Sequence, residues 1–172
     1  MVGIEEFKRG VALMGTRPFG EQFAEELLVR RFDLTRKNGQ HDLEDVEGNR
    51  IEVKTSRVFN KVTGDGIELI LNYANKSFAS VVDKWTANFQ KIHPDEFDII
   101  YFLVVFNEGV SIWSSVKEEM SFSNQHLNNK DMKQFSMSNK TVRNYDNHFV
   151  ECLNWNQVIE LLNNKNYEER IN

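Results

Sequence analysis

The feature that most constrains the fold is residues 97–106, FDIIYFLVVF, which are apolar at every position except Asp98. A strand that is covered on both faces has this nearly continuous apolar character. We therefore predict a buried strand at the centre of a sheet. Asn107, Glu108 and Gly109 are turn residues, and residues 110–113 are predicted to return as its paired strand.

A second constraint comes from residues 40–57, QHDLEDVEGNRIEVKTSR, which have the pattern of a β-hairpin. Gly48 and Asn49 favour a turn, and residues 50–58 alternate and are rich in β-branched side chains. Alternate residues of a strand share a face. Glu52 and Lys54 are expected on one face, and the opposite set should point into a core: Ile51, Val53 and Thr55.

The hairpin loop decides which acid joins Glu52. A three-residue loop at 47–49 puts Asp42 opposite Lys54 and on the same face as Glu52. A loop of two or four residues would bring Asp45 forward instead.

Two carboxylates and a lysine on one face suit a divalent cation. Mg²⁺ prefers oxygen ligands and is commonly held by one or two carboxylates plus phosphate oxygens. Asp42 and Glu52 would suffice as ligands, with the Val53 carbonyl nearby. Lys54 could orient or deprotonate a water, or neutralise charge in the transition state. The implied reaction is metal-assisted hydrolysis of a phosphodiester.

Asp42 followed by Glu52-Val53-Lys54 resembles the PD-(D/E)XK nuclease superfamily, and in particular the type II restriction endonucleases. His41 stands where a proline is common in that superfamily. The resemblance implies an α/β fold with a restriction-endonuclease-like core, in which helices flank a mixed central β-sheet. It also implies Mg²⁺ as cofactor, with Asp42, Glu52 and Val53 as its ligands.

The resemblance extends upstream and downstream of the hairpin, over about residues 20–113. A helix is predicted over residues 21–31. In the superfamily a glutamate of this helix reaches back to the metal site, which implies a catalytic role for Glu21. Glu25 lies one turn later on the same face, so helical geometry leaves both open. Downstream, Gln90 precedes the central strand where the family often places a polar residue near the site.

The charge balance opposes nucleic-acid binding when taken alone, because the net charge is -5 and the pI is about 5.4. Local charge matters more than the total. Basic residues gather around the hairpin. The residues expected to contact DNA are four of these, Arg36, Lys37, Arg57 and Lys61, and the polar Gln90. Acidic residues interleave with them, so a solvated mixed-charge surface is the alternative.

Other segments give weaker patterns. Residues 1–16 suggest a short helix or an irregular arm, 67–73 a strand, and 77–89 a helix with Trp85 on its apolar side. Residues 114–144 are poor in aliphatic side chains and are predicted to be loops with at most short elements, which could read DNA sequence. Residues 155–162 have the pattern of an amphipathic helix.

The chain has 172 residues, 40% of them hydrophobic, which fits a single domain. Its one cysteine, Cys152, excludes an internal disulfide and fits a reducing compartment. Neither a signal peptide nor a membrane-spanning apolar stretch is recognisable, so a cytoplasmic protein without a membrane partner is expected.

The leading hypothesis is a magnesium-dependent endonuclease that cuts a specific double-stranded DNA sequence as a homodimer, since symmetric cutting of two strands favours a two-fold assembly. One alternative is a repair or junction-resolving nuclease of the same fold. Another is a catalytically inactive module that binds DNA or protein, in which Glu52 and Lys54 form a surface ion pair.

Overall fold

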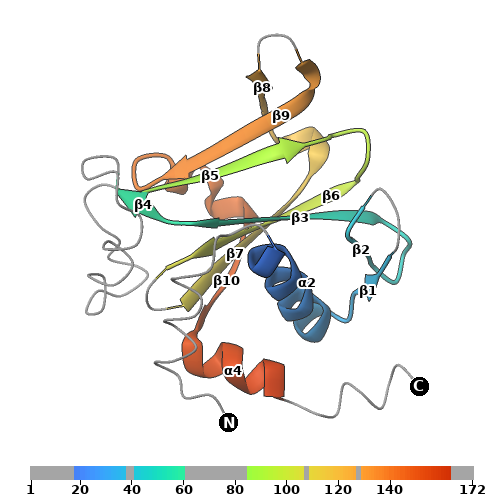
Figure 1. The fold of residues 1–172 in the computed structure, drawn as a ribbon, viewed down its shortest axis with the longest axis vertical. Helices are drawn as coiled ribbons and strands as arrows, with labels where there is room; N and C mark the ends of the chain where they lie inside the picture. The colour runs from blue at the N-terminus through green and yellow to red at the C-terminus, as the bar shows by residue number, and fades with distance from the viewer. Residues whose placement is uncertain (1–17, 38–40, 61–84, 107–108, 127–128, 164–172) are drawn as a thin grey trace.

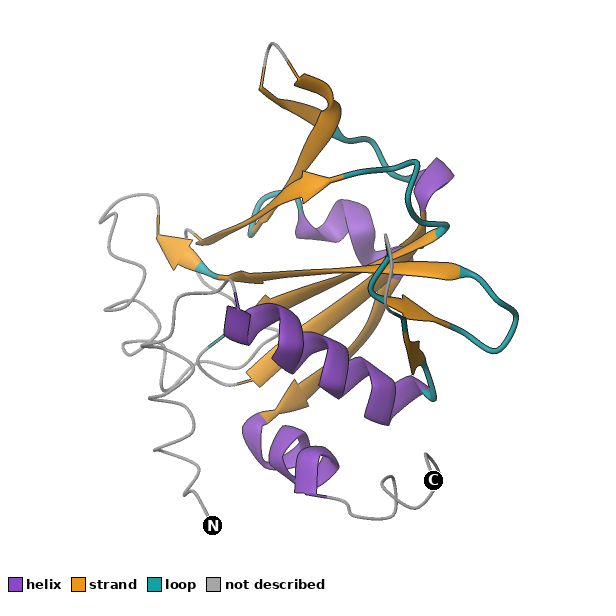
Figure 2. Ribbon diagram, turned by 45° about the vertical axis from the view of Figure 1, so that its right-hand side comes forward, coloured by secondary structure: helices purple, strands orange, loops and turns teal. Residues whose placement is uncertain are grey.

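The described part of the protein is built from two β-sheets and two α-helices in three layers. The computed structural model describes residues 18–37, 41–60, 85–106, 109–126 and 129–163. Helices α2 (Pro18–Phe32) and α4 (Trp155–Asn163) lie on one face of a six-stranded main sheet, and a four-stranded small sheet lies on the other (Figures 1 and 2). The fold is therefore α/β with a mixed central sheet, and helices cover one face of that sheet.

The main sheet has the strand order β1-β2-β3-β6-β7-β10. Its only parallel neighbours among the described strands are β3 and β6, whereas the other pairs are antiparallel. Its strands are β1 (Thr35–Arg36), β2 (Leu43–Glu44), β3 (Arg50–Arg57), β6 (Ile99–Val105), β7 (Gly109–Val116) and β10 (Phe149–Asn154).

Strand β6 is the central strand that the apolar run predicts. Leu103 and Val105 face the helices and belong to the core beneath α2 and α4. Phe102 and Val104 face the small sheet and belong to a second, aromatic core. Both faces of β6 are thus covered, which confirms the prediction, and β7 pairs with it as expected.

The small sheet was not expected from the sequence. Its strand order is β4-β5-β9-β8, made of β4 (Phe59–Asn60), β5 (Trp85–Ile92), β9 (Asn129–Ser138) and β8 (Ser123–His126). The predicted helix over 77–89 is wrong over residues 85–89, where apolar Trp85, Ala87 and Phe89 alternate inward along a strand. As expected, Trp85 is a core residue.

The prediction of loops over residues 114–144 is also wrong. Strand β9 fills ten of these positions, and two short 3-10 helices, η2 (Lys117–Glu119) and η3 (Val142–His148), frame the small sheet. In β9, the buried apolar residues are Phe135 and Met137. A strand with so few apolar residues is stabilised by the aromatic core under it rather than by its own propensity.

The terminal helix α4 confirms the amphipathic segment, with Trp155 and Val158 buried against the core. The predicted arm at 1–16 and the predicted strand at 67–73 lie outside the described residues. Within the described part, neither helix has the length and apolarity needed to cross a bilayer.

Candidate active site

The hairpin forms with a different register from the one expected. Leu43 pairs with Ile51 and Glu44 with Arg50, so five residues, 45–49, connect the strands instead of three. Continued by one residue beyond β2, this register would bring Asp42 opposite Glu52 rather than Lys54. The shift is two residues, and an even shift keeps each side chain on its face. Asp42 therefore still shares a face with Glu52.

The longer connection is organised by Asp45. Its Oδ1 accepts hydrogen bonds from the backbone N–H groups of Glu47 and Asn49 at 3.0 and 2.9 Å, and its Oδ2 accepts one from Asn49 Nδ2 at 2.8 Å. The Asn49 side chain is the largest cause that lowers the pKa of Asp45. Gly48 takes φ 85°, which favours glycine. Asp45 is thus a turn residue, and Asp42 is the acid beside Glu52.

Asp42 lies at the start of the hairpin, against β3. Its Oδ2 accepts a hydrogen bond from the Val53 backbone N–H at 2.7 Å, while its own N–H donates to the Ile51 carbonyl at 3.0 Å. The N–H and C=O of one strand residue point to the same edge. The Val53 carbonyl is therefore directed to the edge of β3 on which Asp42 lies.

Glu52 is the most perturbed acid of the site. Only 7% of the residue is exposed. Burial raises the pKa of Glu52 to about 7, the ion pair with Lys54 opposes that rise, and the negative charges of Asp42 and Glu96 add to it. A half-buried ammonium and two neighbouring carboxylates thus surround a carboxyl group that is costly to ionise.

These groups fit a hard divalent cation. Two carboxylates that repel each other and a main-chain carbonyl supply oxygen ligands, and a cation would relieve the repulsion that raises the pKa of Glu52. In the described part of the chain, no three Asp, Glu, His or Cys side chains gather as a metal site. A Mg²⁺ ion at this place would have Asp42, Glu52 and the Val53 carbonyl as protein ligands, and water or phosphate oxygens would complete its shell.

Two of the glutamates of α2, Glu21 and Glu25, are the candidates for the metal site. Glu21 lies in the first half of the helix, and its side chain is outside the described part. Glu25 Oε2 lies 3.8 Å from Arg36 Nε. Its role as an alternative to Glu21 at the metal site stays a prediction.

The basic residues around the hairpin are largely paired. Arg36 Nη2 lies 2.8 Å from Glu26 Oε2, and Lys37 Nζ lies 3.0 Å from Glu44 Oε1. Arg57 is half-buried, and burial lowers its pKa. These contacts fit the mixed-charge surface that was the alternative interpretation.

The remaining two DNA-contact candidates are Gln90, which is exposed on β5, and Lys61, which lies outside the described residues. The prediction that these side chains bind DNA is not tested by their positions.

Sequence reasoning missed two residues near the site. Glu96 adds negative charge around Glu52, and no motif marks it in the loop before β6. Asp98 binds Arg50 and fastens the start of β3 to the start of β6. The single charge within an otherwise apolar run was the signal that could have identified Asp98.

The sequence matches no protein-family model and no curated protein. Any assignment of function therefore depends on the geometry and chemistry of the residues described above.

Proposed function

We propose that the protein is a magnesium-dependent DNA endonuclease that resembles type II restriction enzymes. The observation that carries the proposal is the meeting of Asp42, Glu52 and Lys54 on one face of the hairpin, with Glu52 buried against the positive charge of Lys54. This grouping supports the proposal, and it arises although the register differs from the expected one.

Asp42 and Glu52 would hold the ion. The hydrogen bond from the Val53 N–H to Oδ2 fixes the orientation of the Asp42 carboxylate. The other carboxylate oxygen, Oδ1, is thereby held in one position in which it could bind a metal ion. Glu52 is held in place by burial and by Lys54. Mg²⁺, when bound, supplies positive charge against the phosphate oxygens.

Lys54 would act on the substrate side of the site. Its ammonium is half-buried beside Glu52, which keeps it close to the place where a phosphate would lie. From there Lys54 can donate hydrogen bonds to a phosphate oxygen or to the attacking water, and so stabilise the negative charge that develops during hydrolysis.

Double-stranded DNA as the substrate, sequence-specific cutting and a homodimer belong to the same proposal. One site of this kind serves one strand, so two copies related by a two-fold axis would cut both strands of a duplex. A repair or junction-resolving nuclease would use the same residues and would differ in preferring branched or damaged DNA.

A catalytically inactive binding module is the second candidate. Two observations favour it: the net charge of -5, and the ion pairs that Arg36 and Lys37 form with glutamates. In this case Glu52 and Lys54 would serve only as a buried ion pair.

Cleavage of a plasmid and phage DNA panel with Mg²⁺, and with EDTA in its place, tests the proposal. Asp42→Asn is the decisive variant, and Asp45→Asn is its matched control, because it removes the same charge from the turn rather than from the site. We expect Asp42→Asn to lower cleavage by at least about a hundredfold and Asp45→Asn to leave most of it.

Two results would contradict the proposal. One is the absence of Mg²⁺-dependent cleavage by folded wild-type protein over the whole panel, which favours the binding module. The other is cleavage that survives Asp42→Asn and Glu52→Gln, which would place the chemistry elsewhere.

A further inference from the structure

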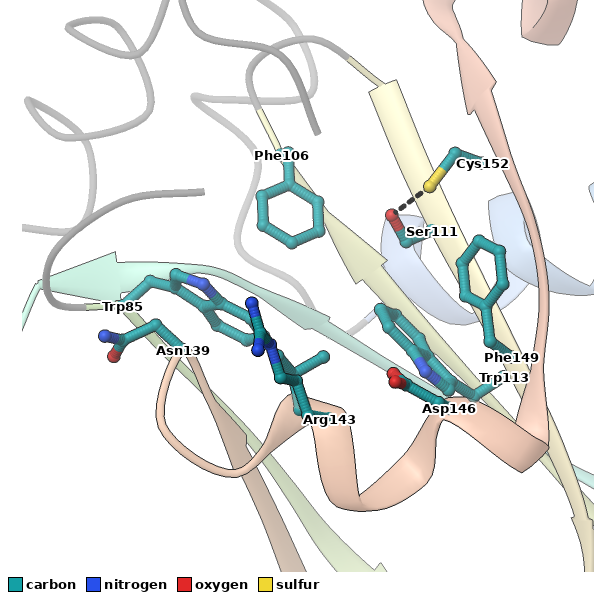
Figure 3. A pocket seen from close by; sticks show the side chains of 10 residues that line it. Trp85, Phe106, Ser111, Trp113, Asn139, Arg143, Asp146, Phe149 and Cys152 are labelled. Atoms are coloured by element: carbon teal, nitrogen blue, oxygen red, sulfur yellow. Dashed lines mark hydrogen bonds between the residues drawn. The ribbon is translucent and has the colours of Figure 1, made fainter. Parts of the chain in front are cut away.

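A cavity of about 540 Å³ opens on the same face of the main sheet as Glu52 and Lys54, but near the opposite edge. Strands β7 and β10 and helix η3 form much of it (Figure 3). Its volume falls in the range of small-molecule sites. Its lining residues are Trp85, Phe106, Ser111, Trp113, Asn139, Val142, Arg143, Asp146, Phe149 and Cys152.

The cavity has two aromatic walls. Trp85 and Phe106 meet edge to face at 5.4 Å between ring centroids on one side, and Trp113 and Phe149 meet at 5.6 Å on the other (Figure 3). Phe149 is 45% exposed, although a phenyl ring gains free energy when it is covered. Walls of this kind accept a flat ring by stacking.

Hydrogen-bond donors on these walls lack acceptors. The indole Nε1 atoms of Trp85 and Trp113 are both buried and have no hydrogen-bond partner in the described part of the protein. A buried donor without an acceptor costs free energy, and Trp usually finds one. Beside the walls lie polar side chains that can form hydrogen bonds with the edge of a heteroaromatic ring, including those of Asn139 and Asp146.

A cation completes the rim. Arg143 is exposed on η3, and Figure 3 shows its side chain extending toward the space between the two aromatic pairs. It forms no ion pair with a described residue. Four other arginines each contact a carboxylate: Arg30, Arg31, Arg36 and Arg50. Arg143 is thus available to an anionic group of a ligand.

We propose that this cavity binds a nucleobase, which stacks against the aromatic walls while its phosphate meets Arg143. A flat heteroaromatic ring with acceptors and donors on its edge, joined to an anion, matches the walls, the polar lining and the rim together. A purely apolar ligand would leave Arg143 and the polar lining unused, and a bare phosphate would leave the walls uncovered.

The position of the cavity separates this base from the scissile phosphate. Lys54, Phe102, Trp113 and Phe149 are successive partners across four neighbouring strands, and directly paired residues share a face. Phe102 is covered by Phe89 of the small sheet, with ring centroids 4.7 Å apart. The small sheet therefore lies between the two sites, and the cavity takes a base other than the one at the cut.

The ligand has two possible sources, a free nucleotide or an unpaired base of a DNA strand. The second source rests on the proposed endonuclease function, whereas the first does not. Both are tested in EDTA, so that cleavage plays no part.

Tryptophan fluorescence provides the readout. Trp155 belongs to the other core, so a Trp155→Phe background leaves the two cavity indoles as the only tryptophans of the sequence. The probes are deoxyadenosine and deoxycytidine monophosphates, base-free deoxyribose 5-phosphate, a short single strand, and a strand of the same length in which every position is abasic. Calorimetry on the wild-type protein repeats the titration in case the background variant folds poorly.

We expect the nucleotides or the single strand to quench the emission and the base-free sugar phosphate to bind at least about tenfold more weakly, since stacking supplies much of the affinity. Phe149→Ala should weaken binding about tenfold and Phe149→Tyr should restore it. Arg143→Ala should weaken nucleotide binding about threefold, and the exposed neighbour Lys140→Ala should not change it.

Quenching by mononucleotides alone assigns a free nucleotide, and quenching by the single strand but not by the abasic strand assigns a DNA base. The inference is overturned if neither the mononucleotides nor the single strand binds up to millimolar concentration. It is also overturned if the base-free sugar phosphate binds as tightly as the mononucleotides. Binding without any Mg²⁺-dependent cleavage would keep the cavity assignment and remove the endonuclease proposal.

Discussion

Strand β3 carries two ion pairs four residues apart, and they differ in nearly every physical respect. Arg50 binds Asp98 through Nη2 at 2.8 Å and Nε at 3.0 Å, and its backbone N–H adds a third hydrogen bond at 3.0 Å. The Asp98 side chain is 39% exposed, and its contacts with Arg50 lower its pKa to about 2. Lys54 contacts Glu52 where the carboxyl group is buried, and there the pKa rises to about 7.

The difference shows that a lysine partner alone does not stabilise the charged form of a buried carboxyl group. Asp98 keeps water and gains a bidentate partner, so its charge is stabilised. Glu52 loses water and faces Asp42, so Lys54 only partly offsets the cost. The first pair fastens β3 to β6, whereas the second leaves a buried carboxyl group that would bind a cation under the proposed function.

The largest expected effect is on activity. Glu52→Gln keeps the shape of the side chain but removes its charge, so we expect Mg²⁺-dependent DNA cleavage to fall by at least about a hundredfold. Asp98→Asn makes the same change in the other pair and should keep cleavage within about threefold. Initial rates on one DNA substrate measure both. Equal losses would show that the two pairs do not differ in function.

The next effect is on stability without metal. Glu52 has a folded pKa of about 7 against an ordinary value of 4.5, so the folded protein holds a proton that the unfolded chain releases between these two values. The free energy of unfolding should therefore decrease as pH rises from about 4.5 to about 7, by on the order of 3 kcal/mol. Urea unfolding of wild type in EDTA measures this decrease.

Glu52→Gln is the control for this titration, because it has no proton to lose at this position. Its free energy of unfolding should lack the decrease between these pH values. A wild-type curve parallel to that of Glu52→Gln would mean that Glu52 is not buried as described.

The smallest effect belongs to the exposed pair. The pKa of Asp98 is lowered, so its contribution is present above about 3.8 and is lost as pH falls toward about 2. At neutral pH, Asp98→Asn should lower Tm by no more than about 3 °C, since an exposed pair contributes little. Thermal unfolding monitored by circular dichroism gives the value. A decrease as large as that of a core truncation would show that this pair is central to the fold.

The sequence predicted the elements whose pattern is local. The apolar run at 97–106 identifies the central strand, and strict alternation across Ile51, Glu52, Val53 and Lys54 places the acid and the lysine together whatever the exact register. In the hairpin, the turn length was not predicted, because the Asp45 side chain stabilises a five-residue connection that no simple loop rule specifies.

The small sheet could not be predicted in the same way. Trp85 fits both a helical spacing with earlier apolar residues and a period of two with Ala87 and Phe89, and the partner strand β9 settles the choice. That strand is polar at most positions, so its pairing depends on residues far away in the chain. The cavity depends on several distant segments at once, which no single stretch of sequence indicates.

The parallel pairing of β3 with β6 joins positions 48 apart, from Ile51 with Ile99 to Arg57 with Val105. During synthesis, translation must pass residue 105 before β3 gains this neighbour. Until then Glu52 is hydrated and its carboxyl group behaves like that of any peptide. A nascent chain that already contains Asp42, Glu52 and Lys54 therefore lacks a formed site, and the proposed hydrolysis would begin only once the later strands are in place.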